Sequence, residues 1–402
     1  MMERRPVRHD SYVYGIATDV IERIDHQGRI DDRIWVLSYS RIRSLDIFRG
    51  LSLAIMTVDH FGGPITRVTQ ETIGFVSVAE AFVFISGIVS GLVYGRLMQQ
   101  SAGQMAAAAL KRARLIYFAH ILSILFIAAV AHYWPALRAV LKSDMGFFPD
   151  PPESIVLYSA LLLHQPQFLD ILPMYVGFLL LTPLMLRLFE MHWDKLALIA
   201  SAGLWGMAQL GWCDRWFAWL RLQCNLQITV GMFDPFAWQL LFVIGLWLGY
   251  RKLTTGKWPV PAGNVWVWWS ITGLLFMFRH SPVGAALLES SDATLRSTLG
   301  WLRLFNFLVL TYSLYRISEY LESFPGTNWL AFLGRHSLAV YVFHTLVLYL
   351  ILPWHNAVKA LSGVWQVILA LIFMGSLSFP AWIHQKWKER QRAWRKAVAV
   401  SS

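Results

Sequence analysis

The stretch LDIFRGLSLAIMTVDH, Leu45 to His60, decides how the rest of the chain is interpreted. It is an apolar segment that nevertheless contains Arg49 and His60, with Asp46 and Asp59 beside them. An ionised group at bilayer depth costs several kcal/mol, so such residues usually face protein or a wet cavity. In a helix, Arg49 and His60 lie roughly 16 Å apart along the axis and within about twenty degrees of one face. We therefore expect both side chains to point into one cleft at different depths, which suits a long anionic ligand.

The composition of the whole chain indicates a membrane protein. Of its 402 residues, 56% are hydrophobic and only 15% are charged, and 20 are Trp. The mean hydropathy of +0.47 is too high for a soluble enzyme of this length. We predict an all-α polytopic membrane protein, a bundle of about ten transmembrane helices of the roughly 17 to 25 residues that a bilayer requires. Their centres are expected in residues 45–61, 75–94, 115–133, 168–189, 196–212, 235–250, 265–278, 299–320, 330–352 and 364–384.

The distribution of basic residues predicts the orientation. Most of the 35 Lys and Arg residues fall before the first span, in alternate loops and after the last span. Cytoplasmic loops carry such an excess, so both termini are expected in the cytoplasm. We divide the chain into a cytoplasmic N-terminal arm (1–44), a transmembrane domain (45–384) and a basic cytoplasmic tail (385–402). The net charge of +11 fits contact with anionic lipid of the bilayer, and we expect no nucleic acid partner.

Two further features concern the predicted outer loops. Cys213 and Cys224 are the only cysteines, and they could form a disulfide in an oxidising compartment. If their segment is a re-entrant helix instead, a separation near 16 Å would exclude the bond. The Trp and Phe residues of these loops suit sugar stacking, and they equally suit a belt at the membrane interface.

His60, Asp59 and Glu80 are the candidate catalytic residues. His60 is near the outer end of its segment and can take up and return a proton near neutral pH. Asp59 projects about a hundred degrees away from it on a helix, so Glu80 or another helix could supply the bond that orients the ring. The alternatives are a helix-end histidine bound to a carbonyl group and a purely structural ion pair at Glu80. The small residues after Glu80, Ser86 to Gly91, predict close packing of the first two helices.

Three other polar clusters lie near span ends. Arg49 can make bidentate bonds to phosphate, or it can simply pair with Asp46 three residues earlier. Arg335 and His336 begin the stretch LGRHSLAVYVFH, whose polar groups suit either a functional role or helix packing. Asp170 begins the fourth span, in FLDILPMYV. The sequence has no motif of a soluble enzyme and no zinc-spaced set of Cys and His, so we expect no metal site.

Five blocks of the sequence together resemble the OpgC family, a branch of the acyltransferase-3-like transmembrane acyltransferases. The resemblance covers most of residues 41–352. The blocks are LDIFRGLSLAIMTVDH, AEAFVFISGIVSGLVYGR, LDILPMYVGFLLLTPLML, DPFAWQLLFVIG and LGRHSLAVYVFH.

The resemblance implies an O-acyltransferase of the bacterial inner membrane that acts on osmoregulated periplasmic glucans. The donor would be acyl-CoA, either succinyl-CoA, as in the best-known members, or acetyl-CoA. Related enzymes carry an arginine, ten residues and a histidine in the first span, so Arg49 would bind the donor and His60 would serve transfer. We place Asp46, Arg335 and His336 with Arg49 at the donor site. The alternatives are a transporter or flippase of an anionic envelope glycan and a non-catalytic scaffold. The oligomeric state stays open.

Overall fold

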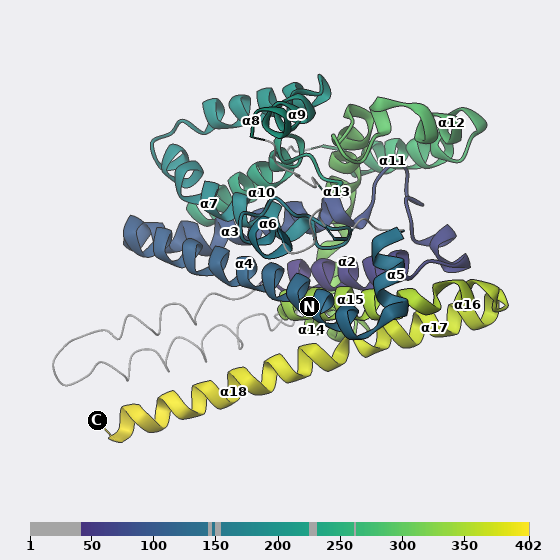
Figure 1. Cartoon of the computed structure of the whole chain (residues 1–402). Helices are drawn as coiled ribbons and strands as arrows, with labels where there is room; N and C mark the ends of the chain where they lie inside the picture. The colour runs from purple at the N-terminus through teal and green to yellow at the C-terminus, as the bar shows by residue number, and fades with distance from the viewer. Residues whose placement is uncertain (1–41, 144–146, 149–153, 225–230, 261–262, 402) are drawn as a thin grey trace, which may run out of the picture. The chain divides into compact units, whose positions relative to one another are not determined.

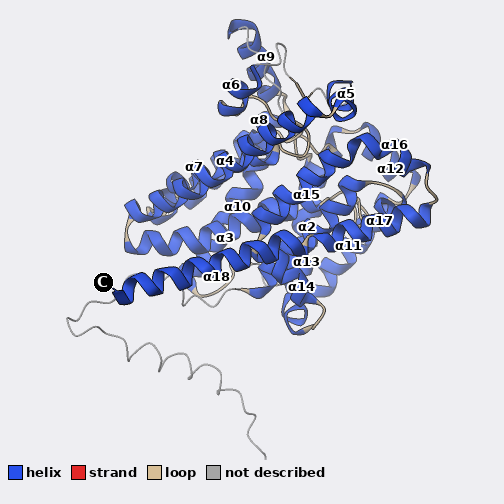
Figure 2. Ribbon diagram, turned by 60° about the horizontal axis from the view of Figure 1, so that its bottom comes forward, coloured by secondary structure: helices blue, strands red, loops and turns tan. Residues whose placement is uncertain are grey.

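The computed structural model describes residues 42–143, 147–148, 154–224, 231–260 and 263–401 (Figure 1). Within these residues, Arg43 to the C-terminus forms one compact unit. The described elements are helices, and Figure 2 shows no strand among them. This confirms the all-α prediction for the described part of the chain. The expected N-terminal arm lies almost entirely outside the described residues.

The helices follow the predicted apolar segments closely. The main ones are α2 (Arg43–Phe61), α3 (Val78–Gln100), α4 (Ala102–Tyr133), α7 (Ile171–Glu190), α8 (Asp194–Gln209), α10 (Pro235–Thr255), α11 (Val265–Arg279), α13 (Trp301–Ser323), α14 (Thr327–Arg335), α15 (Ser337–Ile351), α17 (Gly363–Ser376) and α18 (Ser378–Ser401). Shorter helices connect them: α5 (Pro135–Ser143), α6 (Ile155–Ala160), α9 (Trp212–Cys224), α12 (Pro282–Ser290) and α16 (His355–Ala360).

Fewer helices than expected qualify as membrane spans. By length and composition, five stretches of the described chain could each cross a bilayer: 78–100, 102–133, 171–190, 337–360 and 363–394. Two bent pairs raise the number to seven if each is one span: α8 with α9, at 69°, and α11 with α12, at 78°. These findings support a multi-pass membrane protein. They do not confirm the ten expected spans, and α2 does not qualify, with four charged residues (Arg43, Asp46, Arg49 and Asp59) among its 19.

Local sequence explains where several helices begin. Ser77 and Glu80 form a capping box at the start of α3, in which each side chain accepts the backbone N–H of the other residue. Asp234 caps α10 through the N–H groups of Phe236 and Ala237, and Pro235 follows it in the first turn. These polar caps satisfy backbone donors that a helix end leaves without partners.

A close helix contact in the core joins α3 to α10 through glycines. A Cβ atom added at Gly87 would lie 2.2 Å from the carbonyl oxygen of Phe242, and one at Gly245 would lie 2.2 Å from that of Phe84. Only glycine allows two backbones to approach this closely. The glycines of α3 therefore pack against α10. The expected contact between the first two helices is also present, because α2 and α3 touch, but the glycines of α3 meet α10.

A second glycine contact joins α2 to α14. A Cβ atom at Gly50 would lie 1.8 Å from the carbonyl oxygen of Leu330, and one at Gly334 would lie 2.0 Å from that of Asp46. The N-terminal half of α2 is thus held against α14, directly before α15 begins.

Both cysteines lie on α9, and the structure has them as free thiols. Cys213 is buried and Cys224 is exposed, at opposite ends of one helix. Eleven residues of helix separate them by roughly 16 Å, which is too far for a disulfide. Of the two alternatives for this segment, the structure supports the helical one.

Candidate functional site

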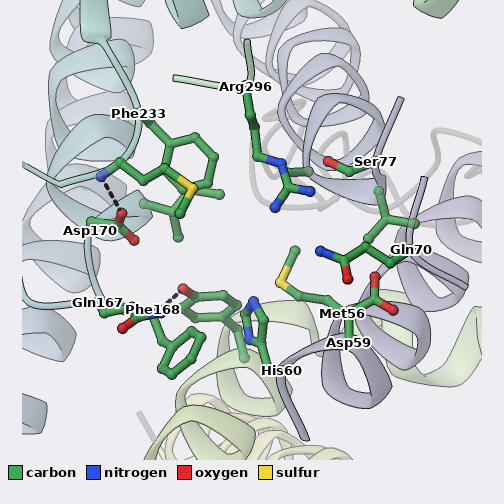
Figure 3. Close-up of a pocket in the computed structure, with 15 residues that line it drawn as sticks. Met56, Asp59, His60, Gln70, Ser77, Gln167, Phe168, Asp170, Phe233 and Arg296 are labelled. Atoms are coloured by element: carbon green, nitrogen blue, oxygen red, sulfur yellow. Dashed lines mark hydrogen bonds between the residues drawn. The ribbon is translucent and has the colours of Figure 1, made fainter. Parts of the chain in front are cut away.

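A cavity of about 290 Å³ opens between the ends of several helices (Figure 3). Its walls combine aromatic rings with amide, carboxylate and guanidinium groups. They come from the end of α2, the start of α3, the segment before α7, the segment before α10, the loop before α13, and α15. The lining residues are Met56, Asp59, His60, Gln70, Ser77, Val78, Ala79, Gln167, Phe168, Asp170, Ile171, Met232, Phe233, Arg296 and Tyr341.

His60 lies on the wall of this cavity, in the last turn of α2. Its Nδ1 atom is 3.3 Å from Nε2 of His344 on α15. The two rings are stacked with centroids 5.5 Å apart, and the ring of Phe168 covers His60 at 4.5 Å. The imidazole of His60 is therefore held on two sides, by a polar partner and by an aromatic ring, while it borders open space.

Asp59 also lines the cavity, but its hydrogen bond goes elsewhere. Its Oδ1 atom accepts a hydrogen bond from the hydroxyl of Thr69 at 2.5 Å. Figure 3 shows Asp59 and His60 on one side of the cavity and Arg296 pointing toward its centre from the opposite side. Asp59 thus borders the same space as His60, and the ring's hydrogen-bond partner is His344.

Glu80 has partners other than the expected ones. Its side chain is fully buried, and its Oε1 atom accepts a hydrogen bond from Arg303 at 2.7 Å. Its Oε2 atom accepts from the backbone and the hydroxyl of Ser77, at 2.9 and 2.5 Å. The expected contact with His60 or Arg49 is therefore replaced by an ion pair, because the capping box directs the carboxylate toward the start of α3. Of the two alternatives for Glu80, the contacts favour the structural one.

The ion pair of Glu80 belongs to a larger network. Arg303 also donates to Oε1 of Glu71 at 2.6 Å, and the same oxygen accepts from Arg296 at 2.7 Å. Burial by itself raises the pKa of the Glu71 carboxyl, but Arg303 and Arg296 oppose it, and the net pKa is lowered. Glu71 therefore stays ionised and holds Arg296 at the edge of the cavity.

Arg49 is not among the lining residues of this cavity. Its Nη2 atom donates to the hydroxyl of Ser337 at 2.6 Å, and its guanidinium lies 5.9 Å from the centre of the Phe82 ring. Phe82 in turn stacks on Tyr341, a lining residue, at 6.5 Å. Two aromatic rings thus connect Arg49 to the cavity, and the expectation that Arg49 and His60 share one cleft stays a prediction.

The other candidate donor residues also lie outside the cavity lining. Asp46 is buried in the first turn of α2. Arg335 is exposed, with its guanidinium 6.0 Å from the ring of Phe332. His336 is buried, and its Nδ1 atom is 3.1 Å from Nδ1 of His384 on α18. The structure thus groups His336 with His384, and it separates both from His60.

Sequence reasoning missed most of the cavity. Asp170 was noticed, and it lines the cavity while accepting the backbone N–H of Met232 at 2.8 Å. Sequence reasoning does not find Arg296, Gln70 and Gln167, because single polar residues in loops carry no spacing signal. It does not find Tyr341 either, because a tyrosine in an apolar helix such as α15 is ordinary. The Ser77 and Glu80 capping box did have a signal, the pattern of Ser with Glu three residues later before an apolar run.

The described residues contain no group of three or more His, Cys, Asp or Glu side chains placed to hold a metal ion. The chemistry that the cavity offers is that of an imidazole, carboxylates and one guanidinium. These groups can bind a polar ligand, accept a proton and orient an anionic or hydroxyl group.

The helical fold and the polar cavity among its helices define a multi-pass membrane protein with a candidate active site. Comparison with known families narrows this class. The family model described as OpgC protein matches residues 41–389, which is most of the chain, and the chain therefore belongs to the OpgC family. This membership points to an acyltransferase that modifies envelope glucans. No curated protein and no solved structure matched the sequence.

Proposed function

We propose that this protein is a membrane O-acyltransferase that moves an acyl group from cytoplasmic acyl-CoA to a hydroxyl of a periplasmic glucan or another envelope glycan. In this proposal about ten helices cross the bacterial inner membrane, with both termini in the cytoplasm. The donor is succinyl-CoA or acetyl-CoA. The observation that carries the proposal is the position of His60, on the wall of a polar cavity in a member of the OpgC family.

The chemistry assigned to His60 is proton transfer. Its imidazole takes the proton of the glycan hydroxyl while the oxygen attacks the thioester carbon. The carbon–sulfur bond breaks, an ester bond forms, and the proton passes to the CoA thiolate. A second scheme has the imidazole carry the acyl group transiently before the hydroxyl accepts it. Asp59 borders the same space, and Glu80 supports the wall through Arg303.

Arg49 is the proposed donor-binding residue, together with Asp46, Arg335 and His336. A guanidinium can bind phosphate groups in a bidentate manner, and Arg49 lies beside Ser337, which can also donate to phosphate. A donor held there has to pass the rings of Phe82 and Tyr341 to reach His60.

The test is transfer of label by the purified protein in lipid nanodiscs. Radiolabelled succinyl-CoA or acetyl-CoA is incubated with periplasmic glucans, and the labelled glucan is separated and counted. His60→Ala should abolish transfer, whereas His132→Ala, at an exposed histidine of α4, should leave it unchanged. Full activity of His60→Ala would remove His60 from the mechanism. Arg49→Ala should weaken donor binding, and unchanged calorimetric affinity would reject its assigned role.

A second candidate, a transporter or flippase of an anionic glycan, has one observation in its favour. The pairs α8 with α9 and α11 with α12 are bent helices, and broken helices often form transport sites. However, none of their residues lines the cavity. A transporter would move labelled glycan across a vesicle membrane and yield no acylated product, and a scaffold would do neither.

A further inference from the structure

His344 on α15 contacts His60 without lining the cavity. Its side chain is fully buried, and the ring of Tyr341 packs against its face at 5.0 Å in an edge arrangement. Among the described residues, no charged side chain forms a hydrogen bond with either ring. The two imidazoles are therefore coupled mainly to each other, and two positive charges at this separation would repel strongly.

The role proposed for His60 requires one arrangement of protons in this pair. Nε2 of His344 is the ring atom that contacts His60, and Nδ1 of His344 makes no hydrogen bond of good geometry to any described residue. A neutral imidazole has one N–H and one bare nitrogen. If His60 accepts a proton at Nε2, its Nδ1 has to carry the hydrogen, and Nε2 of His344 has to be the acceptor.

The contact geometry is compatible with this arrangement. With Nε2 of His344 as the acceptor, Nδ1 of His60 is the donor of the 3.3 Å contact. Nε2 of His60 then carries the free lone pair, and it is the nitrogen left for the cavity that His60 lines. A general base requires this tautomer, since the proton from a substrate has to enter at a bare nitrogen.

We propose that His344 is a positioning residue, which holds His60 in the tautomer and orientation that leave Nε2 bare toward the cavity. This inference rests on the proposed role of His60 as the base. It assigns to a neutral imidazole the orienting task that a carboxylate performs in serine hydrolases. A residue at position 344 should therefore support activity only if its side chain accepts a hydrogen bond from His60. A side chain that only fills the apolar space should not support it.

The kinetic test compares His344→Leu with His344→Gln, because glutamine keeps an acceptor and leucine does not. In His344→Leu we expect kcat to fall about 100-fold, within the range for loss of a general base, with KM for donor and glucan changed less than about 2-fold. His344→Gln should recover at least about tenfold of that loss. His120→Leu is the matched control, since His120 is equally buried in α4 and contacts the carbonyl of His164 instead. Retained kcat in His344→Leu, or equal losses in the two variants, would overturn the proposal.

A substrate-free measurement separates this inference from the proposed function. Diethylpyrocarbonate acylates a bare imidazole nitrogen, and mass spectrometry of the peptide that contains His60 gives the rate. The rate should fall several-fold in His344→Leu and stay near wild type in His120→Leu; equal rates in all proteins would overturn the positioning role. If His344→Leu does not fold, His344→Met replaces it as the apolar variant. A wild-type protein that transfers no acyl group but shows the rate difference would reject the proposed function alone.

Discussion

Replacing Arg303 with Met should be the most destabilising single change in the wall of the cavity. The guanidinium of Arg303 lies on α13 with its side chain 2% exposed. It donates to Glu80 at 2.7 Å, to Glu71 at 2.6 Å and to the carbonyl oxygen of Thr294 at 2.9 Å. Methionine has similar length and no charge, so the change removes these bonds without opening a large cavity.

The size of the loss in unfolding free energy depends on which partners Glu71 and Glu80 retain when Arg303 is replaced. Glu71 keeps Arg296 at 2.7 Å, so its charge is still compensated. Glu80 keeps only the uncharged donors of Ser77, and its side chain is fully buried. Removing one partner of a buried pair costs about 3–5 kcal/mol, because the other charge is left uncompensated. We expect a loss in this range for Arg303→Met, and a smaller loss when Glu80→Gln is combined with it.

Unfolding titrations in mixed detergent micelles, followed by the fluorescence of the 20 Trp residues, give the free energies. The wild type, both single variants and the double variant form a cycle whose coupling energy should exceed about 1 kcal/mol. Arg187→Met is the control, since Arg187 pairs with Glu190 on the exposed surface of α7 and should cost less than about 1 kcal/mol. Additive losses, or a loss below about 1 kcal/mol in Arg303→Met, would refute the reasoning.

Three further predictions concern packing, pH and the thiols. Gly245→Ala should cost about 1–3 kcal/mol in the same titration through overpacking, whereas Gly203→Ala, with open space around it, should cost nothing; equal effects would contradict the glycine contact. Burial lowers the pKa of His164 from 6.5 to about 4, so the folded ring binds a proton less readily than the unfolded one. The unfolding free energy should therefore fall as the pH drops from about 6.5 to 4, by up to about 3 kcal/mol, and His164→Leu should lack this slope. A maleimide should label Cys224 in the folded protein and Cys213 only after denaturation, and a shift in gel mobility on reduction would contradict two free thiols.

The apolar segments of the sequence predict the helices well, but they predict less well how the helices pack. The stretch from Ser86 to Gly91 shows this difference. Its small residues correctly predict a close helix contact, because glycine is needed wherever two backbones meet. Which helix fills that face depends on a complementary pair, Gly245 and Gly249, about 160 residues further along the chain. No local pattern links the two pairs, so the sequence predicts the contact of α3 with α2, which is present, but not the glycine contact with α10.

The number of spans is a second point on which the sequence prediction and the structure differ. The apolar pattern of the sequence predicts α2, α10 and α13 as spans. None of these helices is both long and apolar enough to qualify as a membrane span. In α13, Arg303 is buried against carboxylates, so a polar side chain that disfavours lipid is compensated by protein. A count of apolar residues does not register this compensation, because the compensating groups lie in the loop before α3 and at its start.

The sequence likewise predicts some residues of the candidate site and not others. His60 was found because ionisable residues in an apolar segment are rare, and its position on the cavity wall fits that expectation. Arg296 was not found, although it lines the same cavity, because it lies in a polar loop where an arginine is ordinary. Its significance comes from Glu71, which it reaches only after the chain has folded.

The two sequence blocks that contain Arg49 and Ser337 meet along their length. Arg49 of α2 donates to Ser337 at the start of α15, and His60 further along α2 contacts His344 further along α15. The two helices therefore run in the same direction, with one paired contact at the start of α15 and a second near its middle. The glycine contact between α2 and α14 sets this register, because it brings the backbones together just before α15 begins. The spacing of Arg49 and His60 thus has a counterpart on α15, and the glycines that align the two are as necessary to the site as its polar groups.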